Sequence, residues 1–289
     1  SVKIVDIRKK SSSNIVKNTE DLGIKIYWNS TVVNTFGYKK IKSIEIMNLS
    51  EDGSNVTGNK HKIQCDCLSI SGGWTPMVHM HTQSGGKLDF REIDQVFVPS
   101  EKSENHINVG SCNGDFELEE IVKNTNNKVK KFLNINESGF DKISVLCSKE
   151  LEKKNIWLLP NTISEGKTKS FIDFQNDSTA KDIKLALREG FKSIEHVKRY
   201  TTTGMGTDQG KLSNMHALGI IADTAGVKMG TLGTTTFRPP FTPLTFGAIV
   251  GRSVGKFFDV VRKTSIHEWH VQNNAKFENV GQWKRPWYY

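Results

Sequence analysis

Cysteine, proline and long apolar runs are all scarce in this chain. Its 289 residues include four cysteines and seven prolines, and 36% of the residues are hydrophobic. No apolar stretch approaches the roughly 20 residues that a membrane-spanning helix needs. The cysteines are irregularly spaced, which does not make a disulfide framework in a chain of this size. We therefore expect a globular protein of the reducing cytoplasm, with no membrane span.

Complete metal-binding motifs are also missing. Cys65 and Cys67 precede His79 and His81, which supplies four side chains able to bind zinc. Structural zinc sites usually separate their cysteines by about two to four residues, whereas one residue separates them here. Residues 63–70 also fit a buried strand that uses cysteine as a small apolar residue. Both alternatives stay open, while the histidines near the C-terminus lack HExxH spacing, which excludes a metalloprotease of that type.

The positive charge is not gathered into a nucleic-acid-binding pattern. The formal net charge is +9 and the pI is about 9.2. The lysines are scattered through polar turns and helix faces, and no basic stripe with interleaved aromatic residues is present. A lysine-rich solvated surface accounts for the charge, and an RNA-binding protein is the alternative that rests on charge alone. We expect no nucleic-acid partner.

Residues 195–215 hold the densest group of potential anion-binding side chains. Glycines let backbone N–H groups approach an anion, hydroxyls donate hydrogen bonds, and basic side chains add charge. The segment is not a P-loop, because five residues separate Gly204 from Gly210 and a leucine follows Lys211. An anionic cofactor site and an ordinary Gly/Thr loop between two helices remain alternatives. The candidate binding residues are Lys198, Arg199, Thr202, Thr203 and Lys211.

The first part of the chain predicts many strands. Residues 2–7 form a short apolar pattern with Asp6 near its end, and an acid there accepts ribose hydroxyls in a Rossmann unit. The alternative is an ordinary turn residue. Residues 24–28, 31–36 and 41–46 alternate as half-exposed strands do, and residues 51–54 have the composition of a hairpin turn.

The region from residue 169 to about 230 predicts helices. Ser178 or Thr179 caps a helix with Asp182 in its first turn. An apolar stripe then continues through the helix at spacings of four, four and three, and consists of Ile183, Leu187, Phe191 and Ile194. A second helix begins near Ser213, ends before Gly226, and turns Leu218, Ile221 and Ala222 inward. We predict that the threonine-rich loop joins these two helices.

Several segments resemble the α subunit of heterotetrameric sarcosine oxidase. They are residues 173–177, 179–182, 188–191, 195–202, 234–240 and 262–270. Residues 266–283 are similar to the opening of the glycine-cleavage aminomethyltransferase (T-protein) domain, a fold that binds reduced folate. The resemblance covers nearly the whole chain.

This resemblance implies an α/β protein with three parts. They are a partial disulfide-reductase-like nucleotide-binding domain at 1–123, a helical cofactor-clamping module at 169–235, and the start of a folate domain at 236–289, with a connector at 124–168. We expect an internal fragment of a longer polypeptide. We also expect the apolar patch at residues 157–160 to dock on a neighbouring domain or subunit.

The same resemblance implies where a dinucleotide would lie. In disulfide-reductase-like domains a strand followed by glycines runs past the nucleotide, as residues 63–70 followed by Gly72 and Gly73 do here. A second strand at residues 107–109 leads through Gly110 and Asn113 into a helix at 118–131. That order is similar to the motif that closes over the diphosphate, although Asn113 stands near where an acid is usual.

The implied activity is the oxidative demethylation of sarcosine to glycine. The one-carbon unit passes to tetrahydrofolate and oxygen is reduced to hydrogen peroxide. The implied cofactors are NAD, FMN at the contact between α and β subunits, and tetrahydrofolate; the implied partners are the β, γ and δ subunits. No catalytic residue is expected in this chain. The alternative is a non-catalytic nucleotide-binding scaffold subunit of a related amine or imino-acid dehydrogenase.

Overall fold

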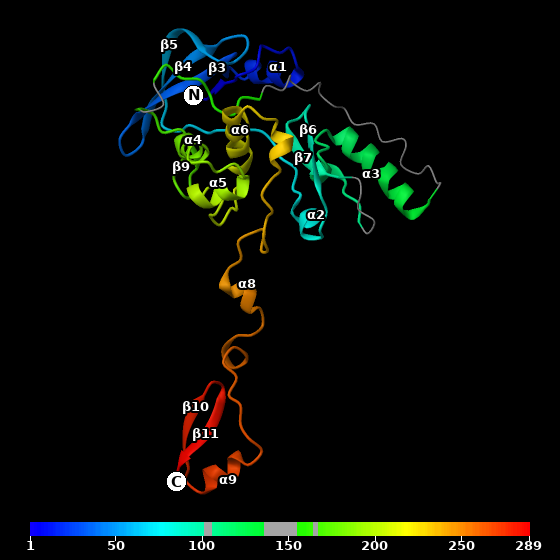
Figure 1. Cartoon of the computed structure of the whole chain (residues 1–289), viewed down its shortest axis with the longest axis vertical. Coiled ribbons are helices and arrows are strands. Elements are labelled where there is room, and N and C mark those ends of the chain that lie inside the picture. Colours follow the sequence, from blue (N-terminus) through cyan, green and yellow to red (C-terminus); the bar gives the residue numbers. More distant parts are fainter. Residues whose placement is uncertain (101–105, 136–154, 164–166) are drawn as a thin grey trace. The chain divides into compact units, whose positions relative to one another are not determined.

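The computed structural model describes residues 1–100, 106–135, 155–163 and 167–289 (Figure 1). The chain divides into two compact units, Ser1–Phe241 and Thr242–Tyr289. The domain boundary that the sequence predicts at residues 235 and 236 lies inside the first unit. Among the described residues, none of the helices is long and apolar enough to cross a bilayer.

The first unit begins with a small parallel β–α–β arrangement. Strand β1 (Lys3–Val5) pairs in parallel with β2 (Lys25–Tyr27), and α1 (Asn14–Asp21) connects them. The predicted strands at 2–7 and 24–28 are therefore confirmed. Helix α1 was not predicted from the sequence, because it is only eight residues long, mostly polar, and buries only Val16.

An antiparallel meander follows. Strands β3 (Ser30–Gly37), β4 (Ile41–Leu49) and β5 (Val56–Gln64) form one sheet in that order, which confirms the strands predicted at 31–36 and 41–46. The predicted hairpin turn lies between β4 and β5. Its Asp52 carboxylate accepts hydrogen bonds from Ser50 and Ser54, and these lower the pKa of Asp52 to about 2.

The strand predicted at residues 63–70 is wrong in its position. Strand β5 starts earlier and ends at Gln64, and residues 65–78 are irregular. The physical reason is the length of its neighbour. Ser43 of β4 pairs with Gln64, and the last bond on this side runs from Cys65 N to Lys42 O at 3.1 Å, close to where β4 begins. Beyond that point β4 offers the chain no further backbone partner.

The next elements are α2 (His79–Gln83), the hairpin of β6 (Leu88–Arg91) and β7 (Val96–Pro99), and a 3₁₀ turn η1 (Gly110–Asn113) before α3 (Leu118–Leu133). The turn and the helix predicted at 118–131 are confirmed. The strand predicted at residues 107–109 is wrong: this segment is extended but pairs with no strand among the described residues. Without ladder hydrogen bonds an extended segment is not a strand.

The helical module consists of a short hairpin and four helices (Figure 1). The hairpin pairs β8 (Phe171–Asp173) with β9 (Ser178–Thr179). The helices are α4 (Ala180–Arg188), α5 (Ile194–Thr201), α6 (Asn214–Ala225) and α7 (Met229–Leu232). Ile183, Val197 and Ile221 are fully buried at the centre of this module, and Phe97 of β7 packs in the same cluster.

The first predicted helix of this module is in fact two helices. Helix α4 ends at Arg188, Gly190 has a φ of +96°, and α5 begins at Ile194. A glycine with positive φ breaks the helical path at no steric cost, and Ser193 precedes the new helix. The apolar stripe misled the prediction because both helices turn their apolar faces to one core. The threonine-rich loop therefore joins α5 to α6, and the helix predicted from Ser213 to Gly226 is confirmed as α6.

The second unit holds α8 (Phe246–Val250), a 3₁₀ turn η3 (Gly255–Phe257), α9 (His267–Gln272) and the hairpin of β10 (Lys276–Val280) and β11 (Trp283–Tyr288). Glu278 and Arg285 face each other across the hairpin and form a cross-strand ion pair. His270 Nδ1 lies 2.5 Å from the Tyr289 hydroxyl, which ties α9 to the end of β11.

Candidate functional site

The threonine-rich loop is built around a buried acid that the sequence analysis missed. Asp173, at the end of β8, is only 3% exposed. Its Oδ1 accepts hydrogen bonds from the backbone N–H groups of Gln175 and Asn176, at 2.8 and 3.1 Å. Its Oδ2 accepts one from Gly204 N at 2.7 Å. One carboxylate thus joins the β8–β9 turn to the loop after α5. The polar run Gln175-Asn176-Asp177 after it is a turn signal, but the sequence did not show the distant partner of Asp173.

The threonines of the loop bond mainly to one another and to the backbone. Thr202, at φ 60°, ends α5 in the left-handed conformation, and its hydroxyl donates to Thr201 O at 2.6 Å. Thr203 is buried, with its Oγ1 at 2.9 Å from that of Thr201. These hydroxyl groups therefore form their hydrogen bonds within the loop. That is the behaviour expected of an ordinary Gly/Thr loop, which the sequence left as the alternative to a cofactor site.

Lys198 and Arg199 lie in the last turn of α5. Lys198 is half-buried and Arg199 is exposed. Cations in this position interact favourably with the carbonyl end of the helix, and their head groups remain available to an anion in solvent. Both basic residues therefore lie in the helix turn just before the loop begins.

Lys211, at the other end of the loop, is turned toward the chain that follows α7. Its Nζ donates to Phe241 O at 2.6 Å and lies 4.0 Å from the centroid of the Phe241 ring. An ammonium group has three donors, so this contact leaves two others. The partner of Lys211 is therefore a backbone carbonyl 30 residues away along the chain.

Asp6 occupies the predicted strand end but already has a partner. It follows β1 directly, and its carboxylate accepts hydrogen bonds from Arg8 N, Nε and Nη2 at 2.7–3.2 Å. Burial opposes ionisation of this carboxyl group. The hydrogen bonds and charge of Arg8 outweigh burial and hold the pKa of Asp6 below its ordinary value. Any ribose hydroxyl at this position would share the carboxylate with Arg8.

Gly72 and Gly73 lie in the irregular segment after β5, and both are exposed. A Cβ on Gly72 would approach His216 Cε1 of α6 at 3.4 Å, whereas Gly73 has a φ of +112° and open space around it. The segment therefore passes beside the start of α6 with bare backbone. This is the geometry that close approach of a ligand requires, although the predicted strand before it is absent.

The turn at Gly110 and Asn113 is held from α3. Gly110 has a φ of +67°. Asn113 Oδ1 accepts from Lys128 Nζ at 2.9 Å, and Asn113 Nδ2 donates to Asp115 Oδ2 at 3.3 Å. Asp115 is 6% exposed and also accepts from Asn124, so a buried acid does stand in this turn, two residues after Asn113. The sequence did not reveal this acid, because the motif that the turn resembles has its acid near position 113.

No group of three or more metal-ligating side chains forms among the residues that the structure describes. Cys65 and Cys67 are free thiols after β5, while His81 is buried in α2. His81 Nε2 contacts Lys87 O at 2.8 Å and its Nδ1 contacts His106 at 2.9 Å, so both ring nitrogens are used. The zinc alternative gains nothing from this arrangement. Cys147 lies outside the described residues.

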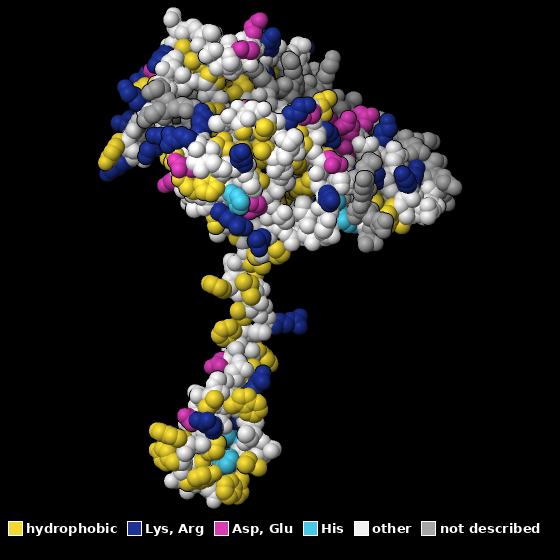
Figure 2. Space-filling model, in the orientation of Figure 1, with side chains coloured by type: hydrophobic (Ala, Val, Ile, Leu, Met, Phe, Trp, Pro, Cys, Tyr) yellow, Lys and Arg dark blue, Asp and Glu magenta, His cyan; other side chains and the backbone are white. Residues whose placement is uncertain are grey.

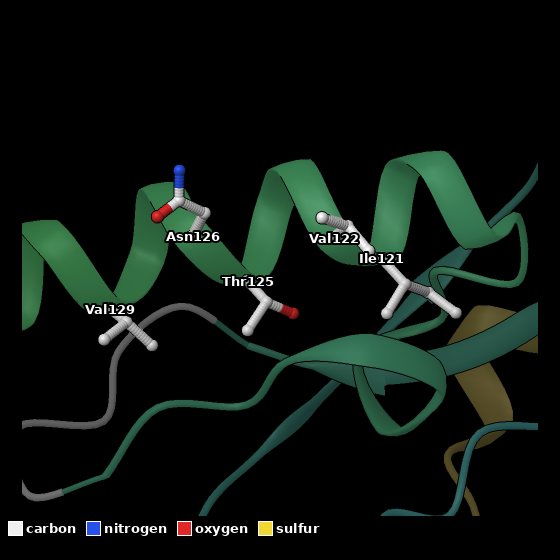
Figure 3. Close-up of a pocket in the computed structure, with 5 residues that line it drawn as sticks. All are labelled: Ile121, Val122, Thr125, Asn126 and Val129. Carbon is white, nitrogen blue, oxygen red and sulfur yellow. The ribbon is translucent and has the colours of Figure 1, made fainter. Parts of the chain in front are cut away.

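A shallow groove on α3 is another candidate, and it is chemically unsuited to an anion. Its volume is about 370 Å³, and Figure 3 shows its lining along one helix. The lining residues are Ile121, Val122, Thr125, Asn126 and Val129. They carry no charge, so the candidate site for an anionic cofactor stays at the loop between α5 and α6. On the face that Figure 2 displays, basic side chains are dispersed among acidic and neutral ones and form no continuous stripe.

Comparison of the fold places the chain among mixed α/β proteins. The crystal structure of L-proline dehydrogenase from P. horikoshii superimposes on 86% of this chain and on 49% of its own, with a TM-score of 0.52 and 17% identity. At that identity the likeness concerns the fold alone.

Sequence comparison gives the particular family. The family model described as the sarcosine oxidase A3 domain matches residues 167–252. The sarcosine oxidase subunit alpha of Corynebacterium sp. (strain U-96) is 33% identical over 100% of this chain and 30% of its own length. The subunit alpha of Rhizobium meliloti (strain 1021) is 35% identical over 89% of this chain and 25% of its own length. The chain is therefore homologous, over its whole length, to the α subunit of sarcosine oxidase, and spans about 30% of the length of these relatives.

Proposed function

We propose that this chain is part of a subunit that contributes to the oxidative demethylation of sarcosine to glycine. In the complete enzyme the one-carbon unit passes to tetrahydrofolate and oxygen is reduced to hydrogen peroxide. The observation that carries the proposal is the match to sarcosine oxidase subunit alpha along the whole chain. The relatives are named as subunits, so we propose that this chain works with partner subunits. We assign the β, γ and δ subunits of sarcosine oxidase as these partners, and the cytoplasm as the location.

The proposed cofactor site is the loop between α5 and α6. Lys198, Arg199 and Lys211 supply positive charge at its two ends, and Thr202 and Thr203 supply hydroxyl groups between them. This donor set fits a phosphate, and we assign it to the phosphate of FMN at the contact with the β subunit. The bound flavin supplies the redox chemistry. The residues of this chain hold the anion and fix its orientation, and Asp173 holds the loop through its hydrogen bond from Gly204 N.

The residues that we propose for nucleotide binding contribute backbone groups as well as side chains. The Asp6 carboxylate, which also binds Arg8, accepts hydrogen bonds from the ribose hydroxyls. Gly72 and Gly73 have no side chains, so the backbone there passes close to the ligand. Gly110 and Asn113 lie near the diphosphate, where Lys128 adds a charge to the turn. We assign NAD to these residues. Tetrahydrofolate belongs to the unit that begins at Thr242.

The test uses the full-length α subunit produced together with its partner subunits. With sarcosine the assembly should form glycine and peroxide in equal amounts, and with tetrahydrofolate present it should form the folate one-carbon adduct. The double variant K198M/R199M should lose flavin, because each lost charge-assisted contact is worth about 1.5–3 kcal/mol, or roughly 10- to 150-fold in affinity. The control is K192M, which removes an exposed charge just before α5.

Two results would contradict the proposal in different ways. An assembly that binds nucleotide but oxidises another amine or imino acid, and not sarcosine, would favour the scaffold subunit of a related dehydrogenase. Equal flavin content and equal flavin dissociation in K198M/R199M and K192M would reject the loop as the phosphate site, whatever the substrate is.

A further inference from the structure

Two thiols stand two residues apart where the chain leaves the sheet of β3, β4 and β5. Cys65 N donates a hydrogen bond to Lys42 O at 3.1 Å, and the chain bends at Asp66 immediately afterwards. Cys65 and Cys67 are both free, and Cys65 is half-buried whereas Cys67 is exposed. The pair therefore combines one thiol held at the sheet with one that a small molecule in solvent reaches directly.

The two side chains have different surroundings. That of Cys65 packs against the apolar cluster formed by Ile44, Ile46 and Ile63. The Cys67 sulfur lies 3.9 Å from Ser69 Oγ, in the irregular segment that follows β5. Because this segment is not part of a strand ladder, the chain at Cys67 can turn without breaking the hydrogen bonds of the sheet.

The covalent geometry of the chain keeps the two cysteines within reach of each other. A disulfide requires Cα atoms about 4.4–6.8 Å apart. Two residues span at most about 7 Å even in a fully extended chain, and a bend such as the one at Asp66 shortens that span. A bond between the two sulfurs therefore needs side-chain rotation and a small movement of the irregular segment, with no displacement of the apolar cluster.

We propose that Cys65 and Cys67 form a modification site for hydrogen peroxide, which converts the two thiols into a disulfide. The exposed Cys67 reacts first, in its thiolate form. Its sulfur attacks one peroxide oxygen, the O–O bond breaks, and a sulfenic acid forms while hydroxide leaves. The proton that the Cys67 thiol gave up converts this hydroxide into water.

Cys65 completes the reaction. Its thiolate attacks the Cys67 sulfur, the S–O bond breaks, and a second hydroxide leaves as the disulfide forms. The proton from the Cys65 thiol converts this hydroxide into water as well. The two sulfurs together lose two electrons, and one peroxide is reduced to two water molecules. Exchange with a thiol such as glutathione returns the pair to its reduced form.

The disulfide has a consequence for nucleotide binding. The chain continues from Cys67 to Gly72 and Gly73, which belong to the residues that we propose for NAD. Closing a small ring just before these glycines changes the path of the backbone that passes the nucleotide. The oxidised protein should therefore bind NAD about fivefold more weakly, or weaker still. This consequence, and the enzyme itself as the source of peroxide, rest on the proposed function, whereas the disulfide does not.

The disulfide is tested by adding hydrogen peroxide to the assembled enzyme and mapping its tryptic peptides by mass spectrometry. The peptide of residues 63–87 contains Cys65 and Cys67 and no other cysteine. It should lose about 2 Da from the fragment ions that contain both residues, and should take up iodoacetamide only after reduction with glutathione. C65S should stop at the sulfenic acid of Cys67, which dimedone captures, whereas the control C112S should form the same disulfide as the unmodified enzyme. Thiols that still take up iodoacetamide after peroxide, or that oxidise further without forming the bond, would overturn the site.

The consequence for NAD is tested by calorimetric titration of the reduced and the oxidised assembly. Peroxide should weaken NAD binding in the unmodified enzyme and in C112S, and glutathione should restore it, while C67S should bind NAD equally before and after peroxide. Equal NAD affinity of the reduced and the fully oxidised enzyme would overturn this consequence. An unmodified enzyme that forms no peroxide from sarcosine would contradict the proposed function, while the peptide map with added peroxide would still decide the disulfide.

Discussion

Gly219, in the middle of α6, leaves the space that the indole ring of Trp157 fills. A Cβ at this position would overlap the Trp157 ring, whose other neighbour is His216, edge-on at 6.0 Å between centroids. Trp157 and Leu158 thereby pack on the core of the helical module. Two residues of the patch at 157–160 therefore dock within the first unit, at a position of α6 that has no side chain, whereas Leu159 is 42% exposed.

The first prediction follows from this contact. G219A should lower the free energy of unfolding by about 1–3 kcal/mol, because an extra methyl group in a filled space forces the indole or the helix to move. The measurement is denaturant unfolding followed by tryptophan fluorescence. G247A is the control, since a Cβ there would meet only Thr245 Oγ1, at 3.9 Å. Equal effects of the two substitutions would show that Trp157 does not rest on Gly219.

The second prediction concerns Asp173. D173N should destabilise the protein by roughly 1.5–3 kcal/mol, the usual worth of hydrogen bonds to a charged group. The Asp173 carboxylate accepts hydrogen bonds with both oxygens, one from Gly204 N and the other from the turn. An asparagine side chain has only one accepting oxygen, so it cannot make both sets of bonds. The change should be accompanied by faster hydrogen exchange at Gly204. D177N, at an exposed position of the same turn, is the matched control. If both variants unfold alike, the buried carboxylate does not hold the loop.

The third prediction concerns the start of α4. The Thr179 side chain accepts from Asp182 N, and the Asp182 carboxylate accepts from Thr179 N at 2.8 Å, which completes a capping box. T179A should cost about 0.5–2 kcal/mol, because it leaves a helical N–H group without a partner. T179S keeps the hydroxyl and should recover most of the loss in a thermal unfolding experiment. A serine variant as unstable as the alanine one would assign the effect to the methyl group instead.

The sequence predicted well those features that depend on neighbouring residues. The ends of α6, the cap of α4 and the positions of β3 and β4 depend on residues close together in the sequence, and all were found. It failed where a distant partner decides the outcome, since the end of β5 depends on where β4 starts. The break at Gly190 does have a local signal, a glycine just after the last turn of α4, but the apolar stripe that continues into α5 concealed it.

The candidate site divides in the same way. Composition drew attention to the loop between α5 and α6 and to Lys198 and Arg199, which lie in the last turn of α5. It did not reveal that Lys211 reaches Phe241, or that Asp173 holds Gly204, because both partners lie about 30 residues away. Hydrogen bonds of this kind carry no local sequence signature, and only the structure shows them.

The last prediction is a pH dependence at Asp6. The pKa of its carboxyl group is lowered from an ordinary value of 3.8, since the bonds from Arg8 outweigh the opposing effect of burial. A carboxylate with a lowered folded-state pKa stabilises the protein above its unfolded-state pKa and loses that contribution as the pH falls through the folded-state value. D6N should therefore be less stable than the unmodified protein at pH 7.

The Asp6 and Arg8 side chains are 13% and 34% exposed, so solvent screening limits the difference to about 1 kcal/mol at most. The difference should shrink below a pH of about 4 and diminish with added salt, measured by denaturant unfolding across the pH range. D21N removes an exposed carboxylate at the end of α1 and should show little difference at any pH. A D6N deficit that stays constant down to acid pH would show that the ion pair with Arg8 is not its origin.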